Sequence, residues 1–260
     1  MPKVTVITAT RNRPDLLRRA IISVKNQTFQ DYEHIIIYDS DDIVSPKVLN
    51  DFKDNRIIGA KSIRKPNDYT FCVLNLGIET SKSDYINVLD DDNILLPYHL
   101  EILYEKIYKN NYDAVYSKFY HIPLNAGDSS VKSILNRSTY DFSGYDENYY
   151  KTVDNIPKRD HLTLLHKKEI NGKILYYNLS ATDRPRTRSA DDGDFMNRLH
   201  GLTNNIGVVN EFTAIYYARK ACHHLDKEYN DLVLKLPPTQ NYVYPELFDD
   251  NLTQQIYMDG

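Results

Sequence analysis

The chain has 260 residues, of which 41% are hydrophobic, and its 32 lysines and arginines face 36 aspartates and glutamates, giving a net charge of −4. This length and apolar content are enough for one large α/β domain with a sizeable core. The nearly balanced charge excludes a general nucleic-acid-binding protein, which would need a basic surface.

The sequence predicts a cytoplasmic location. Cys72 and Cys222 are too few for a disulfide framework, which favours a reducing compartment. The amino terminus has no signal-peptide pattern. No stretch approaches the roughly 20 apolar residues of a membrane span, so we expect no integral membrane segment.

Strand and helix patterns alternate along the first hundred residues. We expect a strand over 4–8, a loop over 9–13, a helix over 14–26 and a second strand within 32–38. A helix around 46–53, a strand near 56–60 and a helix over 71–79 precede an apolar strand over 86–89. This alternation indicates βαβ units and a parallel sheet.

Three consecutive carboxylates, Asp90, Asp91 and Asp92, follow the strand over 86–89. In open α/β sheets, ligands bind beyond the carboxyl ends of the strands. A divalent cation that takes oxygen ligands and bridges to substrate phosphates would offset the repulsion among these carboxylates. The alternative is an acidic turn that only caps the helix beginning near Pro97.

The second half of the chain is less regular. A helix over 100–110 and strands over 114–117 and 162–165 are expected, followed by a helix over 192–200. The stretch 125–150 fits a hairpin or a loop. We expect residues 1–100 to form a nucleotide-sugar-binding half and 101–225 an acceptor-binding and catalytic half of one body. Residues 226–260 are expected to form a tail that packs on that body.

Several segments together resemble the family-2 glycosyltransferases of GT-A fold, and among them the bacterial enzymes of spore-coat polysaccharide synthesis. The resemblance runs in order through nearly the whole chain. It is carried by Pro2–Ile7, Gln27-Thr28-Phe29, Asp39, Asp91-Asp92-Asn93-Ile94 with Pro97, Asp160-His161 with His166, Asp192 with Arg198, and Leu236-Pro237-Pro238.

The resemblance implies an α/β fold with a Rossmann-like, mostly parallel sheet flanked by helices and a smaller mixed sheet on the acceptor side. It also implies inverting transfer of a sugar from a nucleoside diphosphate sugar to an acceptor hydroxyl, in surface polysaccharide or glycan synthesis. The cofactor would be Mn²⁺ or Mg²⁺. By this resemblance Asp92 is the metal ligand, Asp91 contacts the ribose or shares the ion, and Asp90 is the third nucleotide contact.

Further nucleotide contacts are implied near the ends of the first two strands. Asp39 matches the family residue that binds the base, and a carboxylate can accept the N3–H of uracil or thymine, which favours UDP or TDP donors. Thr8, Ala9, Thr10 and Arg11 border the nucleoside. The alternative for Asp39 is a solvated turn shared with Ser40, Asp41 and Asp42.

The resemblance assigns the catalytic base to Asp192, with Asp191 as the alternative. A carboxylate at a helix start is also stabilised by the helix dipole, so a capping role stays open. Contacts to the diphosphate or the acceptor are expected from His161, Arg184, Arg186, Arg188 and His223, with His224 as an alternative to His223.

Two other functions fit parts of the pattern. A sugar-nucleotide nucleotidyltransferase also places paired aspartates and Mg²⁺ on a Rossmann-like sheet, but residues 9–14 lack the expected glycine-rich loop. An inactive glycan- or nucleotide-binding module would keep the fold without catalysis, and the two acidic clusters count against it.

Overall fold

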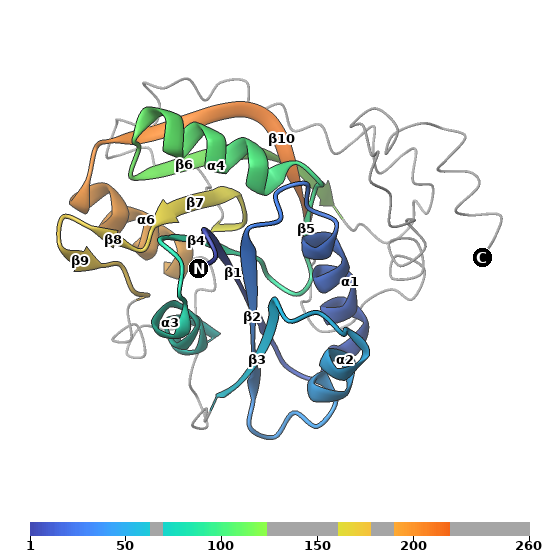
Figure 1. Cartoon of the computed structure of the whole chain (residues 1–260). Helices are drawn as coiled ribbons and strands as arrows, with labels where there is room; N and C mark the ends of the chain where they lie inside the picture. Colours follow the sequence, from blue (N-terminus) through green and yellow to red (C-terminus); the bar gives the residue numbers. More distant parts are fainter. Residues whose placement is uncertain (63–69, 124–160, 178–189, 219–260) are drawn as a thin grey trace, which may run out of the picture.

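The computed structural model describes residues 1–62, 70–123, 161–177 and 190–218 (Figure 1). Across these ranges runs one eight-stranded sheet in the order β3-β2-β1-β4-β7-β6-β10-β5, and β8 and β9 form a separate pair. Helices α1, α2 and α4 pack on one face of the sheet, and α3 and α6 pack on the other. The described residues thus form a three-layer α/β structure.

The amino-terminal half contains the parallel part of the sheet. Its elements are β1 (Val4–Thr10), α1 (Pro14–Lys25), β2 (Tyr32–Asp39), α2 (Ser45–Asp51), β3 (Ile57–Ser62), α3 (Thr70–Thr80) and β4 (Tyr85–Val88). β1 pairs in parallel with both β2 and β4, and β2 pairs in parallel with β3. All seven residues of β1 are buried, as expected for a central strand covered on both faces.

The second half extends the same sheet with mixed pairing. It comprises β5 (Ile94–Leu95), α4 (His99–Asn110), β6 (Ala114–Pro123), the 3-10 turn η2 (His161–Thr163), β7 (Leu164–Lys167), β8 (Glu169–Ile170), β9 (Lys173–Ile174), α6 (Ala190–Leu202) and β10 (Ile206–Ala218). β7 is antiparallel to β4 and β6, whereas β10 is parallel to β6. The mixed strands of the second half therefore continue the parallel part of the same sheet.

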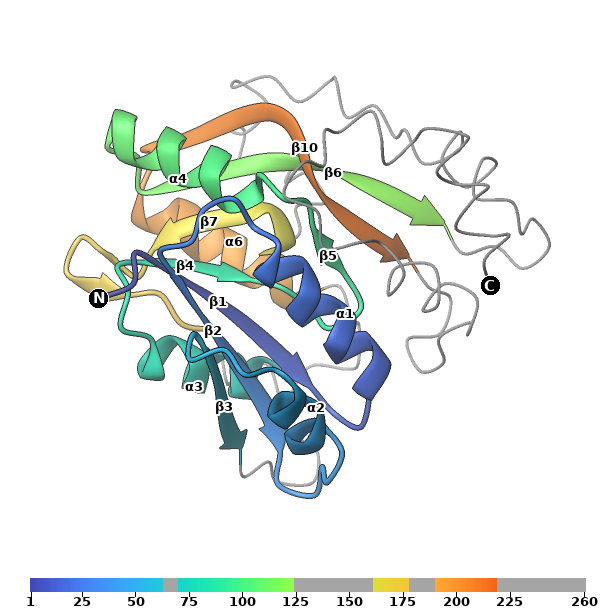
Figure 2. The same cartoon turned by 45° about the vertical axis from the view of Figure 1, so that its right-hand side comes forward.

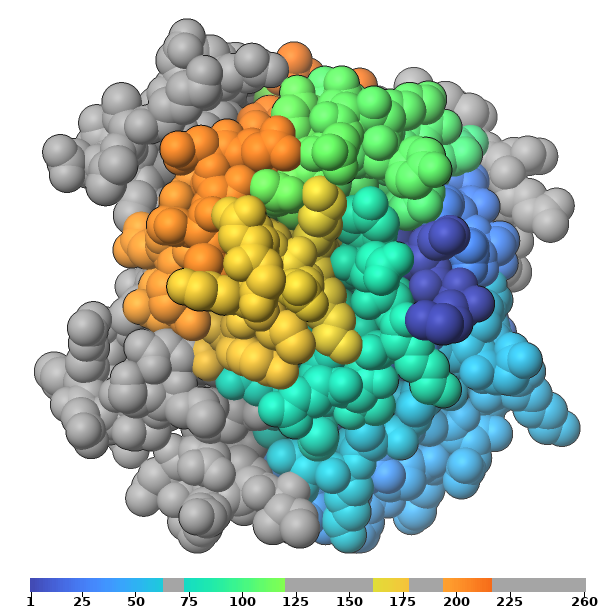
Figure 3. Space-filling model, turned by 60° about the vertical axis from the view of Figure 1, so that its left-hand side comes forward, coloured from blue at the N-terminus to red at the C-terminus, as the bar shows by residue number. Residues whose placement is uncertain are grey.

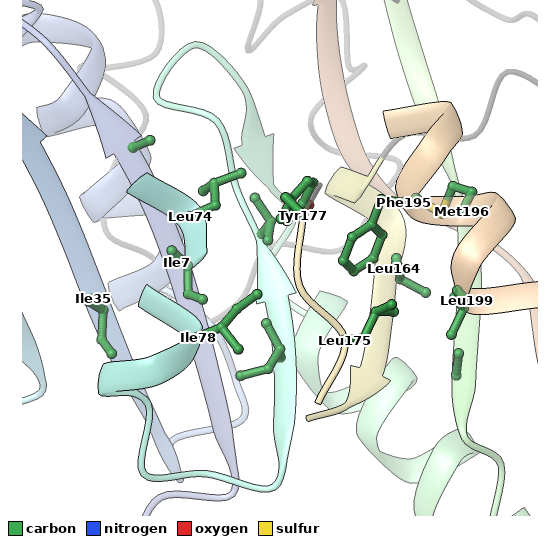
Figure 4. Close-up of a cluster of buried hydrophobic side chains, with 14 of the residues drawn as sticks. Ile7, Ile35, Leu74, Ile78, Leu164, Leu175, Tyr177, Phe195, Met196 and Leu199 are labelled. Carbon is green, nitrogen blue, oxygen red and sulfur yellow. The ribbon is translucent and has the colours of Figure 1, made fainter. Parts of the chain in front are cut away.

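The largest core cluster joins the two halves on the face of the sheet that α3 and α6 cover. Leu74 and Ile78 of α3 pack near Ile7, while Phe195 and Met196 of α6 occupy the neighbouring part of the cluster (Figure 4). A Cβ added at Gly77 of α3 would lie 2.5 Å from the Ile7 side chain, so this glycine lets α3 approach β1 closely.

Only the short acidic turn joins β4 to β5, although the two strands are far apart in the order of the sheet. The sheet must therefore curl to bring its last strand close to β4. β4 is the fourth strand in order and β5 is the eighth. β5 pairs antiparallel with β10 through Leu95–Ala214 and Ile94–Ile215, and the Leu96 amide donates to the Thr213 carbonyl at 2.8 Å. The acidic turn between β4 and β5 thus spans from the middle of the sheet to its last strand.

The structure corrects three expectations about elements. The first strand continues to Thr10, and the sequence did not predict the strands β5, β8, β9 and β10. The acidic turn is not the cap of α4, because β5 intervenes and the residue before the helix, Tyr98, makes no side-chain capping bond. The proposed tail, residues 226–260, and the stretch 125–150 lie outside the described residues.

The amino-terminal half and the second half of the chain adjoin on one face of the molecule. The teal segment that contains β4 borders the yellow segment that contains β7, close to the amino terminus and to the green segment that contains α4 (Figure 3), in line with the antiparallel pairing of the two strands. Within the described ranges, no helix is long and apolar enough to cross a membrane.

Candidate active site

The carboxyl ends of β1, β2 and β4 meet at one edge of the sheet, because these strands are parallel neighbours (Figure 2). β1 extends beyond β4, whose last residue, Val88, pairs with Ile7. Thr10, at the end of β1, therefore reaches the acidic turn. Thr8, Ala9 and Thr10 are buried strand residues, contrary to the expectation that Ala9 and Thr10 lie in a loop.

Asp91 is the most buried carboxylate of the acidic turn, with only 4% of its side chain exposed. One oxygen accepts the Thr10 hydroxyl at 2.7 Å, and the other accepts Nη1 of Arg13 at 2.7 Å. Burial raises the pKa of Asp91, and the charge of Arg13 and the hydroxyl of Thr10 oppose that rise. Both partners thus stabilise the ionised carboxylate.

Asp90 is held by a chain of polar contacts from η2. Nε2 of His161 lies 3.1 Å from its carboxylate, and the Tyr177 hydroxyl lies 3.3 Å from Nδ1 of the same ring. The Nε2–H of the ring donates to the carboxylate, and the Tyr177 hydroxyl forms a hydrogen bond with Nδ1 on the other side of the ring. Burial raises the pKa of Asp90, but His161 and Arg13 outweigh burial and leave it below its usual value.

The predicted base contact, Asp39, lies under an arginine. Its carboxylate is 3% exposed and lies 3.2 Å from Nε of Arg11, whose Nη2 also donates to Asp41 at 2.8 Å. The expected solvated turn is correct only in part. Ser40 and Asp41 are exposed, whereas Asp39 and Asp42 are buried.

Asp42 fixes the loop between the two arginines. It accepts the Asn12 amide at 2.8 Å, the Ser45 hydroxyl at 2.6 Å and the Val44 amide at 2.9 Å. Burial works to raise the pKa of Asp42, but these hydrogen bonds prevail and lower it. Asn12 has a φ of 53°, a left-handed conformation that Asn tolerates. Arg11 and Arg13 thus extend from a loop anchored at its centre.

Helix α6 carries the two predicted catalytic carboxylates at its amino end. Phe195 stacks on Tyr177 with ring centroids 4.3 Å apart, which fixes the helix against the segment that holds His161. The backbone of Asp191 and Asp192 belongs to the first turn of α6, but their side chains lie outside the described residues. Their catalytic role stays a prediction.

The structure therefore brings many of the predicted residues to one edge. Thr10, Asp39, His161 and the acidic turn are linked there through the loop after β1 and η2. The remaining candidates lie outside the described ranges: Arg184, Arg186, Arg188, His223 and His224.

Arg13 and Tyr177 are site residues that the sequence reasoning missed. Three adjacent carboxylates require compensating charge, and Arg13 lies in the loop expected after the first strand. Those two observations together could have identified Arg13. Tyr177 had no comparable signal, because its contact with His161 depends on the path of the chain after β9.

The acidic turn fits a divalent cation that a substrate helps to bind. Among the described residues, no group of three or more His, Cys, Asp or Glu side chains could hold a metal ion alone. Mg²⁺ is commonly bound by one or two carboxylates together with substrate phosphates. Asp91 and Asp92 offer such a pair, since Nη1 of Arg13 lies 2.7 Å from one and 3.6 Å from the other.

Comparison with known proteins points to one family. The model for glycosyl transferase family 2 matches residues 5–162. The poly(ribitol-phosphate) β-N-acetylglucosaminyltransferase TarP of Staphylococcus aureus is 36% identical over 123 residues, which are 46% of this chain and 37% of that protein. The uncharacterised glycosyltransferase MJ1057 of Methanocaldococcus jannaschii is 28% identical over 83% of this chain and 70% of its own length.

Solved structures show the same fold at low sequence identity. Residues 1–349 of S. aureus TarS in complex with UDP-GlcNAc match 99% of this chain and 66% of that one, with a TM-score of 0.62 and 15% identity. The mannosyltransferase PcManGT of Pyrobaculum calidifontis, in complex with GDP-Man and Mn²⁺, matches 90% of this chain and 61% of that one, with a TM-score of 0.58 and 12% identity. The expected GT-A fold is confirmed.

Proposed function

Since the chain belongs to glycosyl transferase family 2, we propose that it is a metal-dependent, inverting glycosyltransferase that uses a nucleoside diphosphate sugar. The observation that carries this proposal is the acidic turn after β4. One carboxylate, Asp91, is anchored by Thr10 and Arg13, and the next, Asp92, lies beside the same guanidinium. A nucleotide diphosphate with its cation is the ligand that such a turn suits.

The donor we favour is a UDP- or TDP-sugar. Asp39 ends the strand beside β1 and could accept the N3–H of a pyrimidine base once Arg11 releases it. Fold relatives bind different donors, UDP-GlcNAc in TarS and GDP-Man in PcManGT. The choice of base therefore rests on Asp39 alone.

The chemistry we propose divides between the two acidic segments. Asp192, or Asp191 in its place, accepts the proton of the acceptor hydroxyl as that hydroxyl attacks the anomeric carbon on the face opposite the nucleotide. Asp92 would hold Mn²⁺ or Mg²⁺, which supplies Lewis-acid stabilisation of the leaving diphosphate. His161 keeps the Asp90 carboxylate in place beside that site.

The acceptor we propose is a glycan, in surface polysaccharide or related synthesis. TarP is named for poly(ribitol-phosphate), and a Campylobacter jejuni relative, 33% identical over 41% of this chain and 35% of its own, is named as a β-1,3-glucosyltransferase acting on an undecaprenol-linked glycan. The narrower link to spore-coat polysaccharide and the cytoplasmic location stay predictions.

Calorimetric titration tests the donor site directly. UDP, TDP, GDP and ADP are titrated with and without Mn²⁺ into the wild type and into Asp92→Asn, which keeps the shape of the side chain. We expect binding of UDP or TDP that needs Mn²⁺ and is weakened at least about tenfold by Asp92→Asn, the loss of one charged ligand contact. Asp51→Asn, on the exposed end of α2, is the control and should bind like the wild type.

The other outcomes separate the alternatives. Selective GDP binding would keep the transferase and overturn the role of Asp39. Absence of any nucleotide binding would end the catalytic proposal. Slow hydrolysis of a bound UDP- or TDP-sugar without acceptor would distinguish an enzyme from a binding module.

A further inference from the structure

The guanidinium of Arg13 occupies the position between Asp91 and Asp92. Its Nη1 donates to Oδ1 of Asp91 at 2.7 Å and lies 3.6 Å from Oδ2 of Asp92. Asp91 is almost fully buried and Asp92 is 19% exposed. A buried carboxylate is costly unless paired, so this arginine neutralises the turn.

The oxygens that face Arg13 are also those that a divalent cation would use. Oδ2 of Asp91 is engaged by Thr10, so a cation would use Oδ1 of Asp91 and the Asp92 carboxylate, the groups that face Arg13. A guanidinium and a divalent cation cannot both lie against these atoms, because like charges at such distances repel. We propose that Arg13 is the resident counter-cation of the donor-free site and that the divalent cation binds by displacing it.

The acidic turn keeps its shape when Arg13 leaves. Thr10 still donates to Asp91, and Nη2 of the buried Arg19 donates to the backbone carbonyl of Asp92. The Asn93 amide also donates to the Asp90 carbonyl at 3.1 Å. These contacts hold the turn from β1, α1 and the turn itself, so the exchange alters only charge compensation.

The exchange also needs little motion of the chain. The Arg13 carbonyl accepts the Leu17 amide at 2.9 Å, which fixes its backbone at the start of α1, and Asn12 is anchored to Asp42. The Arg13 side chain is 26% exposed, so it has a route to solvent. The site is then vacated by rotation of the Arg13 side chain. Arg13 acts on the carboxylates of the turn and not on the reacting atoms, so it is a positioning residue.

This inference rests on the proposed metal-dependent function. It predicts that removal of a side chain from the site raises the affinity for Mn²⁺ instead of lowering it. Arg13→Gln removes the competing charge, so the nucleotide-free protein should bind Mn²⁺ at least about tenfold tighter than the wild type, the equivalent of one charge-assisted hydrogen bond. Arg13→Lys keeps a charge without the planar fork and should give a smaller increase.

The experiment measures Mn²⁺ affinity by electron paramagnetic resonance and calorimetry without nucleotide. Arg18→Gln is the matched control: it removes the same charge from α1, where the arginine pairs with Asp51, and its affinity should stay within about twofold of the wild type. Thermal melting gives a second readout. Without metal, Arg13→Gln should melt lower than the wild type, and added Mn²⁺ should raise its melting temperature by more.

The possible results distinguish a failure of the Arg13 exchange from a failure of the proposed function. Equal or weaker Mn²⁺ binding by both Arg13 variants would overturn the exchange, while Mn²⁺-dependent nucleotide binding by the wild type would leave the proposed function intact. If Arg13→Gln does not fold, an unchanged affinity in Arg13→Lys overturns the inference. If Mn²⁺ binds to no variant, with or without nucleotide, the proposed function fails as well.

Discussion

At the scale of single residues, Thr10 connects the end of β1 to the acidic turn. Its hydroxyl donates to a buried oxygen of Asp91 at 2.7 Å, and no more than 5% of Thr10 is exposed. Since burial already raises the pKa of Asp91, the loss of this donor would weaken the ionised state further. Thr10 therefore contributes to both stability and charge in the site.

The matched substitutions Thr10→Val and Thr10→Ser test this contribution. Thr10→Val keeps the shape but leaves a charged oxygen without its donor, and we expect a loss of about 1–3 kcal/mol in the free energy of unfolding. Thr10→Ser keeps the hydroxyl and should lose less than about 1 kcal/mol. Urea unfolding at pH 7.5 measures both, and equal losses in the two variants would contradict the role of the hydroxyl.

At the scale of elements, two helical glycines that look alike in the sequence have opposite surroundings. Gly77 in α3 faces the Ile7 side chain, where an added Cβ would be 2.5 Å away, whereas an added Cβ at Gly201 in α6 meets nothing within 4 Å. The first glycine is required by packing, and the second only lowers helix propensity.

Replacement of each glycine by alanine should therefore change stability in opposite directions. Gly77→Ala forces α3 away from β1 and should cost about 1–3 kcal/mol. Gly201→Ala should stabilise by up to about 1 kcal/mol, because alanine restricts the unfolded chain and favours the helix. Thermal and urea unfolding measure both, and destabilisation by Gly201→Ala would refute this account of α6.

At the scale of the whole molecule, three buried histidines link stability to pH. Burial lowers the pKa of His34 and His99 to about 3 and that of His166 to about 4. They lie in β2, at the start of α4 and in β7. The effect therefore concerns two strands of the sheet and a helix that packs on it.

The sign follows from proton uptake by the unfolded chain. Unfolded histidine has a pKa near 6.5, so between about pH 6.5 and the folded pKa values the unfolded state binds more protons. Each histidine then lowers the free energy of unfolding by up to about 1.4 kcal/mol per pH unit as the pH falls. Urea unfolding between pH 7.5 and 5 should show this decline, and constant stability over that range would rule it out.

The parallel half of the fold could be predicted from the sequence, whereas β5 and β10 could not. Buried parallel strands such as β2 are continuous apolar runs, with His34 followed by Ile35, Ile36 and Ile37. β5 has only two residues, too few for any period. β10 changes register on either side of Phe212, which disrupts the alternation that identifies a strand.

The candidate site was predicted as a set of carboxylates but not as a set of ion pairs. Strand ends placed Asp39 and the acidic turn at one edge, and the resemblance added His161. The pairings of Arg11 and Arg13 depend on the conformation of the loop around Asn12, which a hydrophobic pattern does not specify. Sequence reasoning therefore identified the charges that need neutralising but not the residues that neutralise them.

The curl of the sheet has a thermodynamic consequence for the acidic turn. Because β4 lies within the sheet and β5 is bonded to β10, both ends of the turn are fixed by strand pairing on folding. The conformational entropy of ordering Asp90, Asp91 and Asp92 is therefore lost when the chain folds, before any ligand arrives. A ligand that binds the turn therefore loses little binding free energy to reorganisation of the turn. This is the advantage that preorganisation gives a binding site.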